Sequence, residues 1–343
     1  MTFADRLVAA WYARGLTPLT APLALLAPVF AGAAALRRML YRLHLMRVER
    51  LPVPVIVVGN ITVGGSGKTP LTAALANELA ARGWRPGIVS RGYGRTAGDA
   101  AADTPLLVGR DTDPERAGDE PLLLARTGHP VAVARDRAAA ARALLAAHPD
   151  CNVILADDGL QHYRLARDVE IAVIDADRGL GNGWRLPAGP LREARARLAT
   201  VDAVVELAGT VAPARPLLPG ALRMTLAGEI FHRVNAPEVT APAAAFAGAG
   251  VHAIAGIGNP ARFFAHLHTL GIRAVTHAFA DHHRFVAADL ALAGATAILM
   301  TEKDAVKCPA FADERCWYLP VRARIDPALV TRIEEKLRGS QAA

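Results

Sequence analysis

Residues 53–69 read Val-Pro-Val-Ile-Val-Val-Gly-Asn-Ile-Thr-Val-Gly-Gly-Ser-Gly-Lys-Thr. The first part is a short, continuous apolar run, which is typical of a strand buried on both faces of a parallel sheet. A helical pattern follows over about residues 69–82. A glycine-rich turn between a buried strand and a helix is the setting that a phosphate-binding loop needs. This stretch therefore predicts an α/β domain built around a nucleotide-binding loop.

The turn itself supplies the groups that hold a triphosphate. Its glycines let successive backbone N–H groups converge on phosphate oxygens without a Cβ clash, and the helix N-terminus adds positive potential. Lys68 would contact the β- and γ-phosphates and take part in catalysis, while the Thr69 hydroxyl would bind Mg²⁺. Thr62 replaces the first glycine of the common pattern G-x-x-x-x-G-K-[ST]. The residues expected to bind ATP are Thr62, Val63, Gly64, Gly65, Ser66, Gly67, Lys68 and Thr69.

Apolar runs separated by helical patterns continue beyond the loop, which is α/β order. The expected strands are 87–90, 131–134, 153–156, 171–175 and 201–206, and later 253–255, 275–279, 297–301 and 317–321. Between these two groups, residues 210–245 are rich in Pro, Ala and Thr, which is typical of a linker. We therefore expect a P-loop NTPase-type parallel sheet with helices on both faces over residues 51–215. A linker ribbon and a smaller α/β C-terminal domain would occupy residues 216–343.

The strand at 153–156 ends in a pair of carboxylates, Asp157 and Asp158. A Walker B strand ends in this way and places oxygen ligands for Mg²⁺ beside the phosphate loop. Taken alone, the pattern also fits a solvent-exposed turn. Because the loop lies upstream, we expect Mg²⁺ as a cofactor together with ATP.

Residues 1–50 are predicted to be membrane-associating helices. No charged residue occurs over 15–36, which at about 1.5 Å per residue is long enough to cross a bilayer. Pro18, Pro22 and Pro28 interrupt this stretch, which favours helices that lie in the membrane interface over a span. Arginines at helical spacing among Leu and Met then follow over 36–47, a pattern that binds anionic lipid and keeps the body of the protein in the cytoplasm. The alternative is a helix hairpin packed against the protein's own core.

Composition narrows the classes of function. Hydrophobic residues make up 52% of the 343 residues and charged residues 21%, so a disordered chain is not expected. A single long uncharged stretch excludes a polytopic channel or transporter. Cys151, Cys308 and Cys316 form no CxxC pair, so neither a disulfide framework nor a structural metal site is indicated. The net charge of +7 favours acidic partners, but aromatic residues are only 5% and no nucleic-acid-binding motif occurs, so we expect a lipid surface and no nucleic acid. The sequence indicates no protein partner.

Several short segments, in this order, resemble the tetraacyldisaccharide 4'-kinase family of lipid A biosynthesis, over nearly the whole chain. The segments are residues 59–70, 90–95, 118–121, 157–162, 186–193, 256–260, 281–282 and 301–304. The family's loop also has Thr at its first position. The resemblance implies transfer of the γ-phosphate of ATP to the 4'-hydroxyl of a membrane-embedded tetraacyldisaccharide 1-phosphate, yielding lipid IVA. It also implies a monotopic or peripheral enzyme at the cytoplasmic face of the bacterial inner membrane.

The resemblance further implies roles for particular residues. Asp119, in Gly-Asp-Glu-Pro, would be the catalytic base, and His282 would pair with it from the second domain. Without the resemblance, Asp119 also fits a helix N-cap and His282 a surface turn. The Mg²⁺ neighbourhood would comprise Thr69, Asp157, Asp158 and Gln161.

By the same resemblance, basic and aromatic side chains after two of the predicted elements would bind the anionic acceptor. They are Arg91, Tyr93, Arg95 and Arg192. Guanidinium groups suit phosphate recognition, although a solvated basic turn has the same composition.

Two other functions share some of these features. One is a membrane-associated P-loop ATPase switch that hydrolyses ATP without phosphorylating a lipid. The other is a nucleic-acid-associated ATPase, which the positive charge alone would suggest. ATP turnover that is independent of acceptor lipid would support the first, and salt-sensitive retention of DNA the second.

Overall fold

The larger of two sheets contains the predicted nucleotide-binding strands. The computed structural model describes residues 3–93, 95, 103–209 and 216–341. Within these residues, the sheet has nine strands in the order β15-β8-β7-β6-β1-β5-β2-β4-β3. Its neighbours are parallel except for β3–β4 and β8–β15 at the two edges. The strands are β1 (Val55–Gly59), β2 (Pro86–Ser90), β3 (Leu106–Val108), β4 (Val131–Val133), β5 (Val153–Ala156), β6 (Val169–Asp175), β7 (Ala203–Leu207), β8 (Leu222–Ala227) and β15 (Arg322–Ile325).

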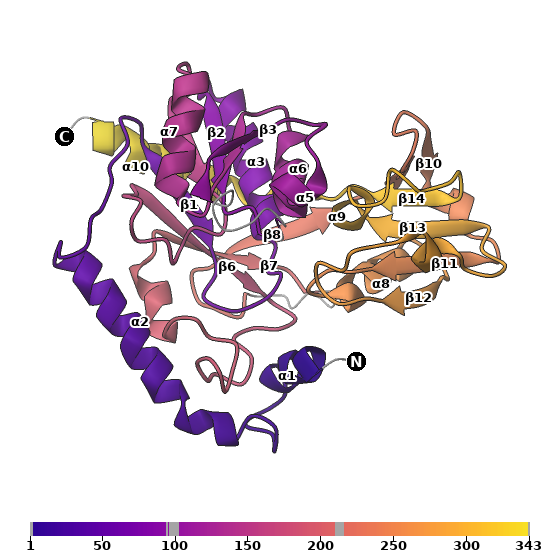
Figure 1. The fold of residues 1–343 in the computed structure, drawn as a ribbon, viewed down its shortest axis with the longest axis horizontal. Coiled ribbons are helices and arrows are strands. Elements are labelled where there is room, and N and C mark those ends of the chain that lie inside the picture. The colour runs from indigo at the N-terminus through magenta and orange to yellow at the C-terminus, as the bar shows by residue number, and fades with distance from the viewer. Residues whose placement is uncertain (1–2, 94, 96–102, 210–215, 342–343) are drawn as a thin grey trace.

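Strand β1 shows how the sequence places this sheet between helices. Ile56 and Val58 pack with α3 (Lys68–Ala81), α6 (Asp119–Ala125) and α10 (Pro327–Gln341), whereas Val55 and Val57 pack on the other face with α7 (Arg137–Ala147). These helices are labelled in Figure 1. Successive side chains of a strand point to opposite faces, so a strand covered on both faces requires an uninterrupted apolar run. The expected parallel sheet with helices on both faces is confirmed. The helices of this unit are α3 (Lys68–Ala81), α5 (Pro114–Ala117), α6 (Asp119–Ala125), α7 (Arg137–Ala147) and α10 (Pro327–Gln341), with the 3₁₀ helix η2 (Arg195–Thr200).

The smaller sheet forms the second unit, at the right of Figure 1. In the described residues its strand order is β10-β9-β14-β13-β11-β12, with parallel pairing from β14 to β12 and antiparallel pairing at β9 and β10. The strands are β9 (Ile230–Arg233), β10 (Thr240–Pro242), β11 (Val251–Ala255), β12 (Val275–Ala278), β13 (Ala297–Thr301) and β14 (Cys316–Leu319). The helices are α8 (Pro260–Thr269), α9 (Glu302–Ala305), η3 (Ala243–Phe246) and η4 (Ala287–Leu290).

The chain divides between the sheets differently from the sequence-based expectation. Strands β8, β9 and β10 fall within the predicted linker, of which 210–215 lie outside the described residues. After β14 the chain returns to the large sheet as β15, which pairs with β8, and then as α10. Two connections therefore run side by side between the sheets, and a Cβ added to Gly228 would lie 2.4 Å from Pro320 O. The second domain is thus an insertion between β8 and β15, and β15 pairs with β8 at the edge of the large sheet.

The N-terminal segment lies along the outside of the large-sheet unit (Figure 1). It contains α1 (Phe3–Trp11), η1 (Pro22–Leu25) and α2 (Ala27–Arg42). In α2 only Ala27 is buried, so the alternative of a hairpin buried in the protein's own core does not describe this helix. Among the described residues, the continuous helical stretch Pro22–Arg42 is the one that is long and apolar enough to cross a membrane. An 18-residue window of it has mean hydropathy 1.5 and is 6% buried.

Candidate active site

The phosphate loop joins the end of β1 to the start of α3. Gly64 has φ +105° and Gly67, which precedes α3, has φ +86°, conformations that a residue with a Cβ rarely adopts. The side-chain amide of Asn60 donates to Ser66 Oγ at 3.0 Å and so ties the two ends of the loop together. Thr62 forms an isolated antiparallel bridge with Leu191, an extended conformation that needs no glycine. The structure therefore explains why Thr can occupy the first position of the loop.

Asp157 and Asp158 follow β5 and lie beside this loop. Asp157 is fully buried and accepts hydrogen bonds from Thr69 Oγ1 and Thr72 Oγ1, each at 3.0 Å. Asp158 Oδ1 lies 3.6 Å from Lys68 Nζ. The expected juxtaposition of loop lysine, loop threonine and paired carboxylates is thus present in the folded chain.

The two carboxyl groups differ in their electrostatic environment. Burial raises the pKa of Asp157, and neighbouring carboxylates raise it further. Burial also acts to raise the pKa of Asp158, but the cationic groups of Lys68, Arg192 and Arg137 outweigh it and hold that pKa at about 2. Asp158 is therefore an anion. Asp157 is a buried carboxyl group whose oxygens could bind a metal ion, and a nearby cation would stabilise its negative form.

The donor set here fits Mg²⁺ that arrives with a nucleotide. In the described part of the chain, no group of three or more His, Cys, Asp and Glu side chains could hold a metal ion by itself. Mg²⁺ does not need such a group, because proteins usually bind it through one or two carboxylates and the substrate's phosphates. Asp157, Asp158 and the Thr69 hydroxyl supply this kind of partial shell.

Gln161, which was expected near Mg²⁺, is engaged with protein groups in this structure. Its Nε2 donates to Asn60 O at 2.9 Å and to Glu193 Oε1 at 2.8 Å. Its Oε1 accepts a hydrogen bond of 3.3 Å from Arg192 Nη1, which also lies 3.5 Å from Asp158 Oδ1. Gln161 therefore holds Arg192 beside the carboxylates, and Arg192 is placed where an anionic substrate could meet it.

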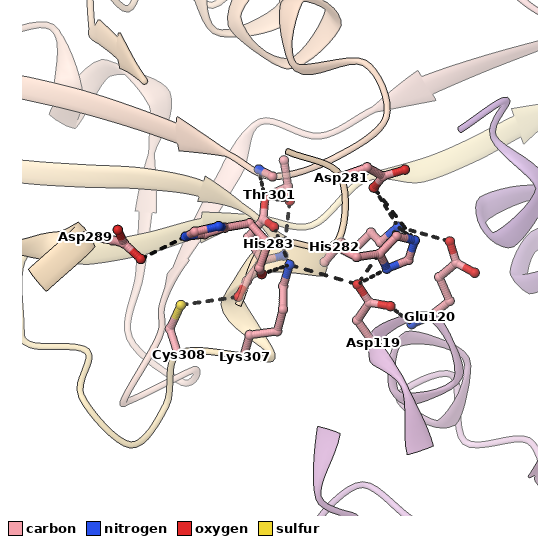
Figure 2. A network of polar contacts seen from close by, with 12 residues as sticks. Asp119, Glu120, Asp281, His282, His283, Asp289, Thr301, Lys307 and Cys308 are labelled. Atoms are coloured by element: carbon pink, nitrogen blue, oxygen red, sulfur yellow. Dashed lines mark hydrogen bonds and ion pairs between the residues drawn. The ribbon is translucent and has the colours of Figure 1, made fainter. Parts of the chain in front are cut away.

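Asp119 and His282 come together from the two units. Asp119 is the first residue of α6 and is buried, while His282 follows β12 with φ +61°. His282 Nδ1 lies 3.0 Å from Asp119 Oδ2 (Figure 2). Burial would raise the pKa of Asp119, but the hydrogen bond to His282 and the nearby lysines lower it. Burial would lower the pKa of His282, and the bond to Asp119 raises it. Each partner therefore favours the charged form of the other.

Two lysines that sequence reasoning did not single out surround this pair. Lys303 Nζ lies 3.0 Å from Glu120 Oε1 and 3.9 Å from Asp119 Oδ2. Lys307 Nζ also lies 3.9 Å from Asp119 Oδ2, and it is held at 2.8 Å by the buried Asp304. Interaction with the neighbouring carboxylates raises the pKa of Lys303 despite its burial. In the sequence, the resemblance of residues 301–304 to the family is the only signal that points to Lys303, and it indicates no role for that residue.

The segment after β2 approaches the same pair. The Tyr93 ring lies 4.8 Å from the His282 ring, and 59% of Tyr93 is exposed. A Cβ added to Gly118 would lie 2.5 Å from Tyr93 O, so the glycine before Asp119 allows this close approach. Arg91 is exposed, and its charge helps to lower the pKa of Arg137, which burial brings to about 10. Arg95 packs against Gly92 on the same segment.

Contacts between the units also cover the phosphate loop. A Cβ added to Gly258 would lie 2.7 Å from Gly65 N, so the turn that precedes α8 rests on the loop. Arg262 of α8 forms ion pairs with Asp175 and Asp177 of the large-sheet unit. The arrangement of a phosphate loop, a carboxylate pair and a buried carboxylate paired with a histidine is suited to aligning a hydroxyl with a terminal phosphate.

Comparisons with known proteins agree with this arrangement. The sequence profile of the family described as LpxK, tetraacyldisaccharide-1-P 4'-kinase, matches residues 19–338. The chain is 54% identical over 320 residues to the tetraacyldisaccharide 4'-kinase of Dechloromonas aromatica strain RCB, covering 93% of this chain and 92% of that protein. It is 53% identical over 331 residues to the protein of the same name from Azoarcus sp. strain BH72, covering 96% and 94%.

A solved structure is similar as well. It is described as an "apo" form of LpxK from Aquifex aeolicus in complex with ATP, and it superposes with a TM-score of 0.74 at 28% identity. The match covers 93% of this chain and 99% of that one. The sequence motifs, the profile match and the full-length relatives lead to the same conclusion: this chain is a kinase that belongs to the tetraacyldisaccharide 4'-kinase family.

Proposed function

We propose that this enzyme transfers the γ-phosphate of ATP to the 4'-hydroxyl of a tetraacyldisaccharide 1-phosphate held in a membrane. The observation that carries the proposal is the contact between Asp119 and His282, which lie 163 residues apart. Glu120, next to Asp119, is close enough to Asp157 beside the phosphate loop to raise the pKa of that carboxyl. A pure ATPase needs only to position a water molecule. A buried carboxylate held from two domains suits a larger acceptor that must be aligned before it reacts.

The loop residues would bind the triphosphate. The backbone N–H groups of the loop and the N-terminus of α3 favour phosphate oxygens, and Lys68 would move from Asp158 toward the β- and γ-phosphates. Thr69, Asp157 and Asp158 would hold Mg²⁺, which supplies charge neutralisation to the phosphates when it is bound. Gln161 would act by keeping Arg192 and the loop backbone in place.

Asp119 would serve as the base. The acceptor oxygen attacks the γ-phosphorus, the bond from that phosphorus to the bridging oxygen breaks, ADP leaves, and the hydroxyl proton passes to the Asp119 carboxylate. The lowered pKa of Asp119 keeps it ionised and ready to accept a proton. Because the transition state of phosphoryl transfer is usually loose, alignment matters more than high basicity.

His282 would hold the carboxylate of Asp119 in its productive orientation. Its Nδ1 binds Oδ2 of Asp119 at 3.0 Å, while Oδ1 accepts the Glu120 N–H at 3.0 Å. Lys303 and Lys307 would preserve the negative form of Asp119 between catalytic cycles. This arrangement makes His282 a positioning residue in the proposed reaction.

The acceptor would reach the site from the lipid surface. Apolar side chains along η1 and α2 are exposed, and arginines lie on the same helix. They suit insertion into the interface of an anionic bilayer, so we place the enzyme at the cytoplasmic face of the inner membrane as a monotopic protein. The acceptor's phosphate and sugar would meet Arg91, Tyr93, Arg95 and Arg192.

A transfer assay tests the proposal. ATP labelled in its γ-phosphate is incubated with Mg²⁺ and the tetraacyldisaccharide 1-phosphate in detergent micelles, and the lipid is separated by thin-layer chromatography. We expect label in the lipid from the natural acceptor and none from an analogue that lacks the 4'-hydroxyl. Equal labelling of both lipids would refute the assigned position, and ATP hydrolysis without labelled lipid would favour the ATPase switch.

A further inference from the structure

Tyr12, just after helix α1, contacts the phosphate loop directly. Its hydroxyl donates a hydrogen bond of 2.6 Å to Val63 O. Burial raises the pKa of Tyr12, against the opposing charge of Arg178, so the hydroxyl remains a donor at neutral pH. The N-terminal segment therefore forms part of the ATP site as well as part of the outer surface.

This hydrogen bond acts on one particular peptide unit. The carbonyl of Val63 and the N–H of Gly64 belong to the same planar trans peptide, so they point in opposite directions. Fixing the carbonyl on Tyr12 therefore fixes the direction of the Gly64 N–H, which is one of the amides that can bind phosphate. The N–H of Val63 is held from another side, by Pro190 O at 2.9 Å.

Arg178 connects Tyr12 and the phosphate loop to the second domain. Its guanidinium carbon lies 4.8 Å from the centre of the Tyr12 ring, and the side chain donates to Gly258 O. A Cβ added to Gly64 would lie 3.2 Å from Arg178 Nη1 and 3.9 Å from Tyr12 Oη. Tyr12, Arg178 and the turn that covers Gly65 thus converge on the loop glycines.

Trp11, the last residue of α1, is held by residues 182–187 of the large-sheet unit. Its Nε1 donates to Pro187 O at 2.8 Å, and its carbonyl accepts the Asn182 N–H at 2.8 Å. A Cβ added to Gly181 would lie 2.6 Å from Trp11 O, so this approach requires a glycine. Further along the same segment, Leu191 pairs with Thr62 of the phosphate loop. Displacing the end of α1 would therefore disturb both the hydrogen bond from Tyr12 to Val63 and the segment that pairs with Thr62.

The same segment contains the side chains that face outward and suit a lipid surface. Phe3 in α1 is 67% exposed, and Leu25 and Val29, next along the segment, are 82% and 70% exposed. If docking on lipid changes how this segment holds the loop, lipid and nucleotide change each other's affinity, and they do so by the same factor because coupling between two sites is reciprocal.

We propose that Tyr12 is a positioning residue of the phosphate loop, through which docking of the N-terminal segment on an anionic lipid surface raises the affinity for ATP. This inference rests on the proposed function for the membrane role of the segment. In this proposal the lipid surface itself regulates ATP binding, whether or not that surface contains acceptor.

The experiment measures binding of a non-hydrolysable ATP analogue with Mg²⁺ by titration calorimetry, using the full chain with and without vesicles of phosphatidylglycerol and phosphatidylethanolamine. We expect the vesicles to tighten binding to wild type by about fivefold or more. Tyr12→Phe keeps the ring and removes the donor, so we expect binding about fivefold weaker and a vesicle effect below about twofold. Melting temperatures would confirm that each variant is folded.

Tyr318→Phe is the matched control, because it removes a tyrosine hydroxyl from β14 in the second domain. We expect it to bind the analogue, and to respond to vesicles, as wild type does. Unchanged affinity in Tyr12→Phe, or an equal vesicle effect in wild type and Tyr12→Phe, would overturn the inference. Since no acceptor is present, failure here is distinguishable from failure of lipid phosphorylation, which only the transfer assay detects.

Discussion

Replacing Asp119 by Asn tests the assigned base most sharply, because it changes charge and proton affinity with little change in size. An amide oxygen can still accept the hydrogen bond from His282, so the contact of 3.0 Å between the units need not be lost. The variant cannot take the acceptor's proton. General bases typically contribute about 10²–10⁴ in rate, so we expect kcat to fall by about that factor, equivalent to about 3–5 kcal/mol.

The structure also predicts what this substitution leaves unchanged. Asp119 contacts His282, Lys303 and Lys307, all from the second unit, and no hydrogen bond or ion pair joins it to the phosphate loop among the described residues. We therefore expect the affinity for the ATP analogue to change by less than about threefold. The assay is transfer of labelled phosphate under saturating ATP, together with calorimetric binding of the analogue.

Asp281→Asn is the matched control. Asp281 Oδ1 lies 3.4 Å from Lys303 Nζ and 3.8 Å from His282 Nε2, so the same charge is removed from the same cluster. Its side chain is 35% exposed, compared with 6% for Asp119, and solvent screens the loss. We expect kcat within about tenfold of wild type. Near-normal transfer by Asp119→Asn, or an equal loss in both variants, would refute the assignment of Asp119 as base.

Three further predictions address the loop, the domain contact and the membrane segment. Lys68→Met should lower kcat/KM by about 10²–10³, because one electrostatic contact to the phosphates is lost, and steady-state kinetics would contradict this if the loss were below tenfold. In denaturant melts, His282→Asn should lower the free energy of unfolding by about 1–3 kcal/mol at about pH 6 and by less at about pH 9. The reason is the raised pKa of His282 in the folded protein. The contribution of the pair is complete below the ordinary value of 6.5 and is lost as pH rises through the folded value. The lowered pKa of Asp119 means that the contribution is lost on the acid side only as pH falls below the ordinary 3.8 through the folded value. An equal destabilisation at about pH 6 and about pH 9 would refute the ionic pair. The double substitution of Leu25 and Val29 by Asp should abolish flotation with anionic vesicles. Val275, an exposed apolar residue of the second unit, provides the control, and we expect Val275→Asp to float as wild type does. Retained flotation of the double variant would remove these helices from the membrane contact.

The local elements around the phosphate loop could be predicted because their signals are local. The apolar run that becomes β1 is uninterrupted, and both of its faces are buried against helices. Asp157 and Asp158 lie beside the loop because the carboxyl ends of neighbouring parallel strands meet at one edge of a sheet. Most strands accordingly begin and end close to their predicted limits.

The long-range pairings could not be predicted from local pattern. Nothing in the residues of β15 indicates that it leaves the second unit and pairs with β8, since a short alternating strand fits either sheet. The contact between Asp119 and His282 was predicted only through resemblance to a family, and Lys303 and Lys307 had no assigned role. A lysine is ordinarily an exposed residue, so only the folded positions of Glu120 and Asp304 show why these two are buried.

The central claim is that phosphate goes from ATP to the lipid and not to water. The most direct measurement follows ADP, inorganic phosphate and phosphorylated lipid together in one reaction, with the position of the new phosphate determined by mass spectrometry. The account predicts that ADP and lipid bearing a 4'-phosphate form in equal amounts, and that ADP formation depends on acceptor. Release of ADP with an equal amount of inorganic phosphate, at a rate that acceptor does not change, would contradict it.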